Sequence, residues 1–330
     1  MSRVNVSFVV IALNASSTLD ALFECLREQE YPHDHIEVIL VDSASADDTK
    51  EKMLSFRDTA TGFQRIVVLD NPKKTLPCGW NVALGAVTGE AVLRVDAHTT
   101  FPKDFIALNV RDLEKGEDIC GGKVVSVPTD RSAWGITLNE AENSMFGGSF
   151  AAFRRADSPR YVSTAAFAIY RKAVFDAVGR YNERLTRTED NEMHYRMRKA
   201  GFRFYYDPEI VSYRLTRATL GKLLKQKYLN GYWIGRTLGV EPRCFSLYHF
   251  VPFAFVLAIL ASAILAAAGI VWPAVLLWAA YGIADLLMTA AAVIGCRERN
   301  GWFVTLPVIF LLLHVSYGLG TIWGIAHMIR

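Results

Sequence analysis

Short apolar runs alternate with longer amphipathic stretches in the first part of the chain. Runs rich in Val, Ile and Leu are typical of buried strands, and the stretches between them repeat apolar residues at helical spacing. The predicted strands are Ser7–Ile11, Ile36–Val41, Arg65–Leu69 and Ala91–Val95, and the predicted helices are Thr18–Glu28, Asp47–Phe56, Pro77–Val87 and Lys103–Leu113. This alternation predicts an α/β fold with a mostly parallel central sheet and flanking helices.

The last part of the chain has a different pattern. Three long apolar stretches, at about 250–271, 273–296 and 302–328, can each cross a hydrocarbon core of ~30 Å as a helix. The second stretch contains one ionisable residue, Asp285, which a membrane span would turn toward neighbouring helices. The sequence therefore predicts a membrane domain over residues 244–330 with three transmembrane helices.

Composition supports this division of the chain. Hydrophobic residues make up 52% of the 330 residues, and the mean hydropathy of +0.19 is high for a soluble protein. Residues 244–330 contain five charged side chains, which excludes a uniformly soluble enzyme. The many charges before residue 244 equally exclude a transporter that lies mostly within the membrane.

A basic block precedes the apolar stretches. Residues 196–243 hold 11 Lys and Arg against 3 Asp and Glu, and beside a membrane segment such a block is typical of a cytoplasmic surface facing anionic lipid, so no nucleic acid partner is expected. Within it, residues 216–243 include a predicted basic amphipathic helix that lies at the membrane interface or packs on the first domain. Arg297 and Arg299 also favour the cytoplasmic side, so residues 1–215 are expected in the cytoplasm.

Several common catalytic motifs are missing from the sequence. The chain has no G-x-x-x-x-G-K-[ST] motif, no G-x-G-x-x-G after the first strand, no HExxH and no GxSxG, which excludes the P-loop, dinucleotide, zinc-protease and serine-hydrolase signatures. Its five cysteines have no CxxC spacing, so neither a zinc ribbon nor a disulfide framework is indicated.

Two aspartates come directly after predicted strands. Asp42 follows the second strand and Asp96 follows the fourth. Ligands of parallel α/β sheets bind beyond the carboxyl ends of the strands, so the pair indicates a binding site. The alternative is that each aspartate caps the helix that follows.

Five sequence blocks, taken together, resemble the inverting family 2 glycosyltransferases, which have the GT-A fold. In chain order the blocks are Ser7–Asn14, Val41–Thr49, Gly79–Leu84, Arg94–Thr99 and Thr188–Glu192. Their order and spacing are more specific than any single block. The whole chain, with its three-span tail, is most similar to the members that build bacterial exopolysaccharide of the succinoglycan type.

The resemblance implies a donor site in the first half of the chain. Ala12 to Asn14 would contact the nucleoside of a UDP-sugar, and Asp42 would accept a hydrogen bond from the uracil imide. Arg94 and Asp96 are also expected to bind the nucleotide-sugar, with Arg94 as a nearby cation that offsets the charge of the departing diphosphate. Asp96 and His98 stand where the family has Asp-x-Asp, and would hold a divalent cation, Mn²⁺ or Mg²⁺, against the diphosphate. His98 departs from the family pattern, and the alternative is that it donates to a phosphate oxygen.

The resemblance also implies a catalytic base. Asp190 would take the proton of the acceptor hydroxyl, with Glu189 and Trp233 on the acceptor side. The alternative for the acidic residues at 189–192 is that they favour the positive end of a helix through Lys199. Residues 134–161, rich in Gly, Ser and aromatic residues, are expected to form an acceptor-side loop or a plain connecting loop.

The function implied is a multi-pass enzyme of the bacterial inner membrane. It would move glucose from UDP-glucose, in β-1,3 linkage, onto a polyprenyl-diphosphate-linked saccharide, and would work with the bilayer and other polysaccharide-assembly enzymes. One alternative is a processive polysaccharide synthase, although residues 226–230 lack the Gln-x-x-Arg-Trp motif of processive members. Another is a non-catalytic, nucleotide-sensing assembly subunit at the membrane.

Overall fold

The computed structural model describes residues 3–148 and 156–329. They form two compact units, of which the first comprises residues 1–125 and 151–214 and the second comprises residues 126–150 and 215–330. Residues 126–150 therefore group with the C-terminal helices, whereas the sequence pattern had placed them within a continuous first domain of residues 1–215. Their partners in the second unit give the physical reason, described below.

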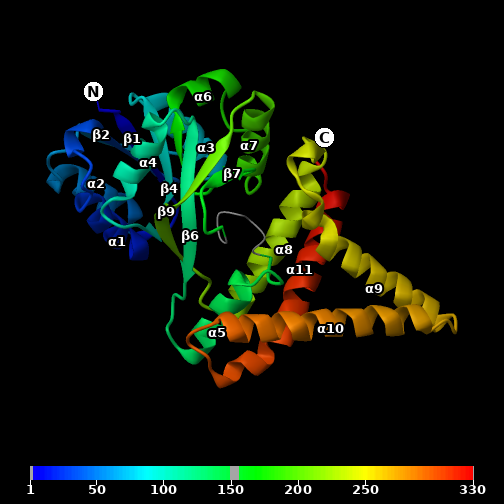
Figure 1. Cartoon of the computed structure of the whole chain (residues 1–330). Coiled ribbons are helices and arrows are strands. Elements are labelled where there is room, and N and C mark those ends of the chain that lie inside the picture. Colours follow the sequence, from blue (N-terminus) through cyan, green and yellow to red (C-terminus); the bar gives the residue numbers. More distant parts are fainter. Residues whose placement is uncertain (1–2, 149–155, 330) are drawn as a thin grey trace. The chain divides into compact units, whose positions relative to one another are not determined.

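A mixed sheet forms the centre of the first unit (Figure 1). Its described strands are β1 (Val6–Ala12), β2 (Ile36–Asp42), β3 (Arg65–Asp70), β4 (Ala91–Asp96), β5 (Thr99–Thr100), β6 (Ile119–Val127), β7 (Arg160–Val162), β8 (Ile169–Arg171) and β9 (Phe204–Leu215). The spatial order is β3-β2-β1-β4-β8-β6-β9-β5, and β7 pairs with β9. The first four predicted strands are confirmed.

The direction of the strands changes half-way across the sheet. β3, β2, β1 and β4 are parallel, whereas β8 is antiparallel to both β4 and β6. β9 is antiparallel to β5 and β7. The prediction of a mostly parallel sheet therefore holds for the half of the sheet built from the first 96 residues, where strand and helix alternate.

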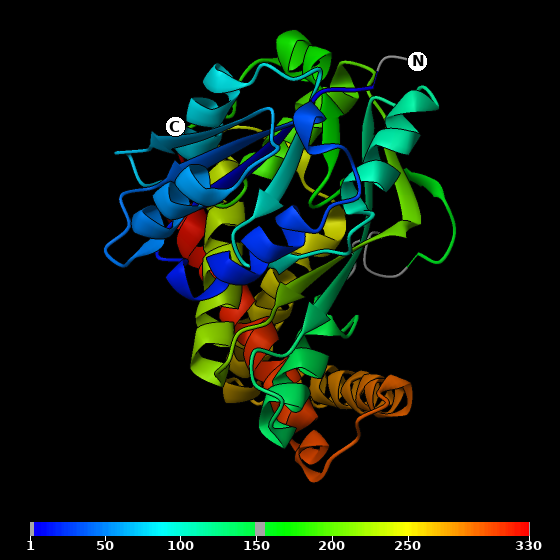
Figure 2. The same cartoon turned by 90° about the vertical axis from the view of Figure 1, so that its left-hand side faces the viewer.

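Helices cover both faces of this sheet. The described helices of the first unit are α1 (Ser16–Arg27), α2 (Thr49–Thr59), α3 (Leu76–Ala86), α4 (Phe105–Glu114), α6 (Lys172–Val178) and α7 (Glu189–Lys199). One apolar cluster joins the strands to α1, α2 and α4, and a second joins them to α3, α6 and α7. Figure 2 shows α1 and α2, in blue, in front of the strands.

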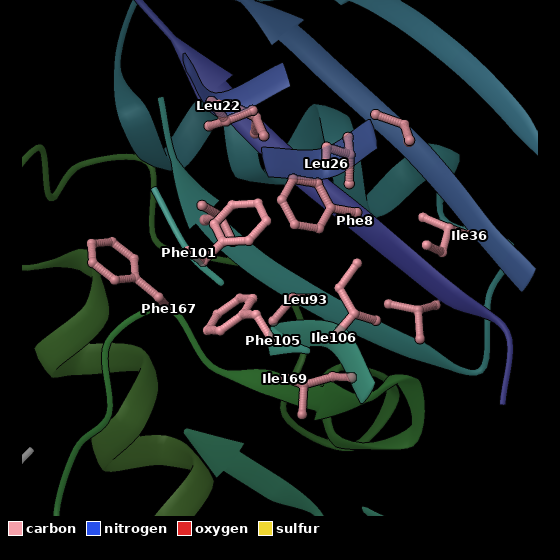
Figure 3. Packing of buried hydrophobic residues seen from close by; sticks show 14 of the residues in the cluster. Phe8, Leu22, Leu26, Ile36, Leu93, Phe101, Phe105, Ile106, Phe167 and Ile169 are labelled. Carbon is pink, nitrogen blue, oxygen red and sulfur yellow. The ribbon is translucent and has the colours of Figure 1, made fainter. Parts of the chain in front are cut away.

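The first cluster is the larger part of the core. Phe8 of β1 and Phe101 pack with ring centroids 5.5 Å apart, and Phe101 stacks on Phe105 of α4 at 4.9 Å. Leu22 and Leu26 of α1 are fully buried against them (Figure 3). All seven residues of β1 and of β2 are buried, which is expected of strands covered on both faces.

The second unit contains the apolar helices. Its described helices are α5 (Ala133–Asn143), α8 (Leu220–Thr237), α9 (Val251–Ala267), α10 (Trp272–Gly295) and α11 (Leu306–Ala326), with short 3-10 helices at Pro242–Cys244, Leu247–Phe250 and Gly301–Thr305. Three helices, Leu247–Ala267, Trp272–Gly295 and Gly301–Ala326, are long and apolar enough to cross a membrane. Asp285 of α10 is 5% exposed, as expected for an ionisable group that faces other helices.

The predicted amphipathic helix is α8, and it packs along α11. Glycines of the two helices meet at this contact, where the carbonyl oxygen of Tyr317 lies only 2.0 Å from the place of a Cβ on Gly231. A Cβ on Gly324 of α11 would likewise lie 2.0 Å from the carbonyl oxygen of Tyr232. The two backbones therefore touch, as in close-packed membrane helix pairs.

Residues 134–161 contain a helix where the sequence pattern predicted a loop. α5 begins after Ser132, whose Oγ accepts a hydrogen bond from the backbone N–H of Gly135 at 3.1 Å. Leu138 and Ala141 of α5 pack with α8 and α11, so tertiary packing stabilises this helix despite the weak helix propensity of Gly135. Residues 149–155 of the predicted loop lie outside the described residues.

The end of α5 is fixed by polar contacts within the second unit. Nε2 of His314, on α11, donates to the carbonyl oxygen of Phe146 at 2.6 Å, and the hydroxyl of Tyr281, on α10, lies 3.0 Å from Nδ1 of His314. Nζ of Lys227, on α8, donates to the carbonyl oxygen of Gly147 at 2.6 Å. Three helices thus fix residues 146 and 147, which explains why this part of the chain belongs to the second unit.

Candidate active site

The carboxyl ends of β1, β2 and β4 bring the first group of predicted residues to one edge of the sheet. The register pairs Ala12 with Asp42 and Ile11 with Asp96, so Asp42 and Asp96 stand on either side of β1. The backbone N–H of Ser43 donates to the carbonyl oxygen of Ala12 at 2.8 Å, which ties the first two strand ends together.

The loop after β2 is built on Asp42 and Asn14. Both carboxylate oxygens of Asp42 lie 3.3 Å from the backbone nitrogen of Ser45, so Asp42 shapes this loop. The N-cap residue of α2 is Asp48, so Asp42 does not cap that helix. Asn14 adopts a left-handed backbone, with φ of 51°, and its Oδ1 accepts from the backbone N–H of Ala46 at 2.8 Å. Asn14 is exposed while Ala12 and Asp42 are buried, so Asn14 is the member of this group most open to a ligand.

Asp96 is the last residue of β4, and His98 lies in the turn that follows. Both side chains are partly exposed. Thr18, in the first turn of α1, fixes the residue between them, because its Oγ1 donates to the carbonyl oxygen of Ala97 at 2.8 Å. The carboxylate and the imidazole therefore come from one restrained turn at the ligand edge of the sheet.

A second group of residues surrounds Arg94 of β4. Its side chain is 12% exposed, and its Nη2 lies 3.5 Å from Oε1 of Glu189, in the first turn of α7. Its guanidinium carbon lies 4.8 Å from the ring centroid of Trp80 and 5.8 Å from that of Tyr181. Asp190 follows Glu189 and is partly exposed. The structure thus places one cation beside the predicted base and its neighbour.

The acidic residues of α7 separate into two kinds. Glu192 forms an ion pair with Arg196 one turn later, at 2.6 Å, which is a local contact that stabilises the helix. Glu189 makes no such pair within the helix; it is buried, and its Oε2 has no hydrogen-bond partner in the described part of the chain. An ion pair within the helix therefore accounts for Glu192 but not for Glu189, although all three acidic residues stand in the first turn of α7, as the helix-terminus interpretation expects.

Burial changes the protonation of these groups. Burial and the charge of Asp190 raise the pKa of Glu189 to about 8, while Arg94 acts in the opposite direction. Burial also raises the pKa of Asp190 above its ordinary value. For Arg94, burial disfavours the charge, but Tyr181, Asp190 and Glu189 together raise its pKa, so it remains a cation. Both carboxyl groups of the pair therefore hold a proton more tightly than exposed carboxyl groups do.

Two further contacts hold this group in place. Asn81 of α3 binds the backbone of Tyr181 twice, through Nδ2 to the carbonyl oxygen and through Oδ1 to the N–H, each at 2.9 Å. His194 of α7 is buried between Thr164 and Tyr170, with its ring nitrogens 2.7 Å and 3.0 Å from their hydroxyl oxygens. Burial lowers the pKa of His194 well below its usual range, so this histidine is neutral and structural.

Sequence reasoning found the acidic residues of the site but missed its aromatic ones. Trp80 lies in a sequence block quoted above, yet nothing in the block indicates that its ring contacts Arg94. Tyr181 lies about 90 residues beyond Arg94 along the chain, and no local pattern signals it. Trp233 lies on α8 in the second unit, where its ring centroid is 4.8 Å from the guanidinium carbon of Arg236.

The donor set at the end of β4 fits a divalent cation that is shared with a substrate. No group of three or more His, Cys, Asp and Glu within residues 3–148 and 156–329 could hold a metal by itself. Asp96 and His98 offer two ligands, and a cation that takes its other ligands from a diphosphate and water needs no more from the protein. The two residues therefore fit a metal that binds together with a nucleotide.

Comparison with known proteins decides the family. Residues 7–179 match the family described as Glycosyl transferase family 2. This range includes Asp42, Asp96 and Arg94, whereas Tyr181, Glu189 and Asp190 lie beyond it. The chain belongs to glycosyl transferase family 2. A protein of this family transfers sugars, so this chain is a glycosyltransferase.

Two curated proteins show how far the similarity extends. The succinoglycan biosynthesis protein ExoA of Rhizobium meliloti (strain 1021) is 32% identical over 234 residues, which cover 69% of this chain and 68% of that protein. A Methanococcus voltae enzyme, a dolichyl N-acetyl-alpha-D-glucosaminyl phosphate 3-beta-D-2,3-diacetamido-2,3-dideoxy-beta-D-glucuronosyltransferase, is 23% identical over 321 residues, or 95% of each chain. The second similarity spans the apolar helices as well as the family 2 domain.

Solved structures support the fold. The mannosyltransferase PcManGT from Pyrobaculum calidifontis, in complex with GDP-Man and Mn²⁺, covers 98% of this chain and 88% of its own, with a TM-score of 0.65 and 19% identity. S. aureus TarS 1-349, in complex with UDP-GlcNAc, covers 70% of this chain and 66% of its own, with a TM-score of 0.51 and 20% identity. The family 2 domain of this chain therefore has the GT-A fold.

Proposed function

We propose that this family 2 enzyme transfers a single sugar, glucose from UDP-glucose, onto a polyprenyl-diphosphate-linked saccharide with inversion at the anomeric carbon. The observation that carries the proposal is the carboxylate pair of Glu189 and Asp190 beside Arg94. An inverting transfer needs one base for the acceptor hydroxyl and no covalent intermediate. Asp190 supplies that base, because it is partly exposed and burial raises its pKa above the ordinary aspartate value, which makes it a stronger proton acceptor.

The donor would bind at the carboxyl ends of the strands. Asn14 and the backbone near Ala12 would contact the nucleoside, and Asp42 would accept from the uracil imide. Asp96 and His98 would hold Mn²⁺ or Mg²⁺ against the diphosphate. A bound divalent cation offsets the negative charge that develops on a departing diphosphate. The solved mannosyltransferase contains Mn²⁺ with its donor, which supports a metal in this site.

The acceptor is proposed from the apolar helices and from the relatives. Three of the described helices can cross a membrane, and α8 carries Lys222 and Lys225 at exposed positions, which suits an anionic lipid surface. The name of the Methanococcus relative describes transfer to a dolichyl-phosphate-linked sugar in a 3-beta linkage, and the Rhizobium relative takes part in succinoglycan biosynthesis. These names support a lipid-linked acceptor, a β-1,3 bond and a role in bacterial exopolysaccharide assembly at the inner membrane.

Transfer by purified protein tests the proposal. The detergent-solubilised enzyme is incubated with Mn²⁺ or Mg²⁺, a polyprenyl-diphosphate-linked galactose, and labelled UDP-glucose, UDP-galactose or GDP-mannose in separate reactions. One added glucose with a β-1,3 bond, identified by mass spectrometry and NMR, supports the proposal. A ladder of products supports a processive synthase instead, which the weaker similarity to a Staphylococcus epidermidis poly-beta-1,6-N-acetyl-D-glucosamine synthase makes worth testing. UDP binding without turnover indicates a non-catalytic assembly subunit.

The variant Asp190→Asn tests the assigned base in the same assay. Its side chain keeps its size but does not take a proton, so kcat should fall by roughly 10²- to 10⁴-fold. The affinity for UDP should stay close to that of the wild type, because Asp190 does not bind the donor in this proposal. Asp176→Asn, at an exposed position on α6, is the matched control and should keep wild-type kcat. Wild-type activity of Asp190→Asn contradicts the assignment.

A further inference from the structure

Arg94 lies in the β4 block that leads to the proposed metal-binding turn, and its charge makes the donor diphosphate an obvious partner. The structure gives its guanidinium other contacts. Trp80 and Tyr181 lie beside it, with ring centroids 4.8 Å and 5.8 Å away, and Oε1 of Glu189 lies 3.5 Å from its Nη2. Only 12% of the side chain is exposed, so little of it is available to a ligand.

Glu189 is buried next to Arg94, and its carboxylate depends on this cation for compensation of its charge. Its side chain is 3% exposed, and its Oε2 has no hydrogen-bond partner in the described part of the chain. A buried carboxyl group without compensation is strongly destabilising, and breaking a buried pair leaves the remaining group uncompensated. Arg94 is the cation that contacts Glu189 in this structure. Glu189 in turn directly precedes Asp190 in the first turn of α7.

The aromatic contacts give Arg94 a fixed place. A planar guanidinium stacks on aromatic rings, which a lysine ammonium does less well. Asn81 holds the backbone of Tyr181 through two hydrogen bonds of 2.9 Å, so α3 contributes both Trp80 and the residue that positions Tyr181. This arrangement links α3, β4 and the first turn of α7 through one side chain.

We propose that Arg94 is a positioning residue for the carboxylate pair of Glu189 and Asp190, and that it does not bind the diphosphate of the donor. The proposal rests on the proposed function, in which Asp190 is the base. Arg94 offsets the buried charge of the pair and holds the first turn of α7 in the orientation that presents Asp190 to the acceptor. The ionisable groups that interact electrostatically with the pair are Arg94 and Asp96 of β4, Tyr181, and Tyr170 of β8.

The variant Arg94→Met separates the two roles by comparing kcat with UDP affinity. It removes the charge and keeps much of the apolar volume. A misplaced base should lower kcat by on the order of 10²-fold, while the Kd for UDP, measured by calorimetry with Mn²⁺ present, should change by less than about threefold. A residue that bound the diphosphate would instead weaken UDP by roughly 10- to 100-fold when removed, and that result overturns the proposal.

Two further variants control for the fold. Arg94→Lys keeps the charge but loses the planar stacking group, so it should recover roughly tenfold of the lost kcat. Arg171→Met removes a cation of β8 that donates to the carbonyl oxygen of Leu113, away from the pair. It can lower the unfolding temperature but should leave kcat unchanged. A loss of kcat in Arg171→Met equal to that in Arg94→Met contradicts a specific positioning role.

A thermal unfolding cycle tests the contact without any donor. Above about pH 8, where Glu189 carries its charge, Arg94→Met should lower the unfolding temperature of the full chain by more in the wild type than in a Glu189→Gln background, because the amide needs no cation. Equal losses in both backgrounds overturn the pairing. If the wild-type protein neither binds UDP nor turns over, the proposed function fails, and this cycle still decides whether Arg94 and Glu189 act as a pair.

Discussion

Glu189 is a carboxyl group in surroundings that disfavour its charge. Its pKa of about 8 lies above the ordinary value of 4.5, so the folded protein binds a proton that the unfolded chain releases between those two values. The contribution of Glu189 to stability is therefore fully present below about pH 4.5 and is lost as the pH rises through about 8.

The variant Glu189→Gln should remove this dependence on pH. Its unfolding temperature, measured in detergent by differential scanning fluorimetry, should rise relative to that of the wild type as the pH increases from 5 to 8. The reason is that the wild-type protein releases the Glu189 proton when it unfolds, which a rising pH favours, whereas the variant has no such proton to release. Glu28→Gln, at an exposed position after α1, is the control and should track the wild type at every pH. A constant offset between Glu189→Gln and the wild type contradicts the raised pKa.

Individual residues of the site differ in how far the sequence predicts them. Asp42 and Asp96 are readable from the chain, because a polar residue directly after a buried strand marks the ligand edge of a parallel sheet. The contact of Trp80 and Tyr181 with Arg94 is not readable, since α3 and the segment after α6 meet only when the sheet has formed. The burial of Glu189 also depends on the packing of α7, which no local pattern encodes.

At the scale of elements, the clearest feature is the contact between α8 and α11. A Cβ on Gly235 would lie 2.5 Å from the carbonyl oxygen of Thr321 and 2.6 Å from the backbone nitrogen of Ile325. These are backbone atoms, which move only if the helices separate. At Gly221, in the first turn of α8, a Cβ would meet nothing within 4 Å. α8 thus has one glycine, Gly235, in close contact with α11 and another, Gly221, with free space around it.

The paired variants Gly235→Ala and Gly221→Ala should change stability in opposite directions. Alanine favours a helix over glycine by about 1 kcal/mol, which should stabilise the protein at position 221. At position 235 overpacking should outweigh that gain and give a net destabilisation of about 1–2 kcal/mol. Thermal unfolding of the detergent-solubilised variants measures both. Equal shifts at the two positions contradict the close contact of α8 with α11.

The sequence predicted the elements of the first 113 residues well, because β1, β2 and most of β4 are buried runs of apolar residues and each helix has one apolar face. It did not predict α5, whose Leu138 and Ala141 find their partners in helices far along the chain. It also did not predict the antiparallel half of the sheet. β8 has only three residues, and a strand that short carries no usable periodicity.

At the scale of the molecule, the positive residues predict the orientation in the membrane. Arg297 and Arg299 lie between α10 and α11, whereas the connection between α9 and α10 carries no charge. The former should therefore lie in the cytoplasm and the latter outside. Both connections have exposed positions, Glu298 and Ile270, at which a cysteine can be placed.

Cysteine labelling in cells tests this orientation. With Cys296 replaced by Ser, Ile270→Cys should react with a membrane-impermeant maleimide in spheroplasts. Glu298→Cys should react only after the membrane is permeabilised, because the reagent cannot reach the cytoplasm. Trypsin accessibility of the first unit, compared before and after permeabilisation, gives a second measure. Labelling of Glu298→Cys in intact spheroplasts contradicts the predicted orientation.

The path of the chain between the two units limits how this enzyme can be cut or recombined. The chain leaves the first unit after residue 125, contributes α5 to the second unit, and returns before it leaves again after residue 214. A single cut near residue 215 would therefore remove the partners of Leu138 and Ala141 on α8 and α11 while leaving α5 attached. To exchange the first unit between two relatives, the chains would have to be joined at three points, near residues 125, 150 and 214. The two units are therefore expected to be inherited together and to vary together.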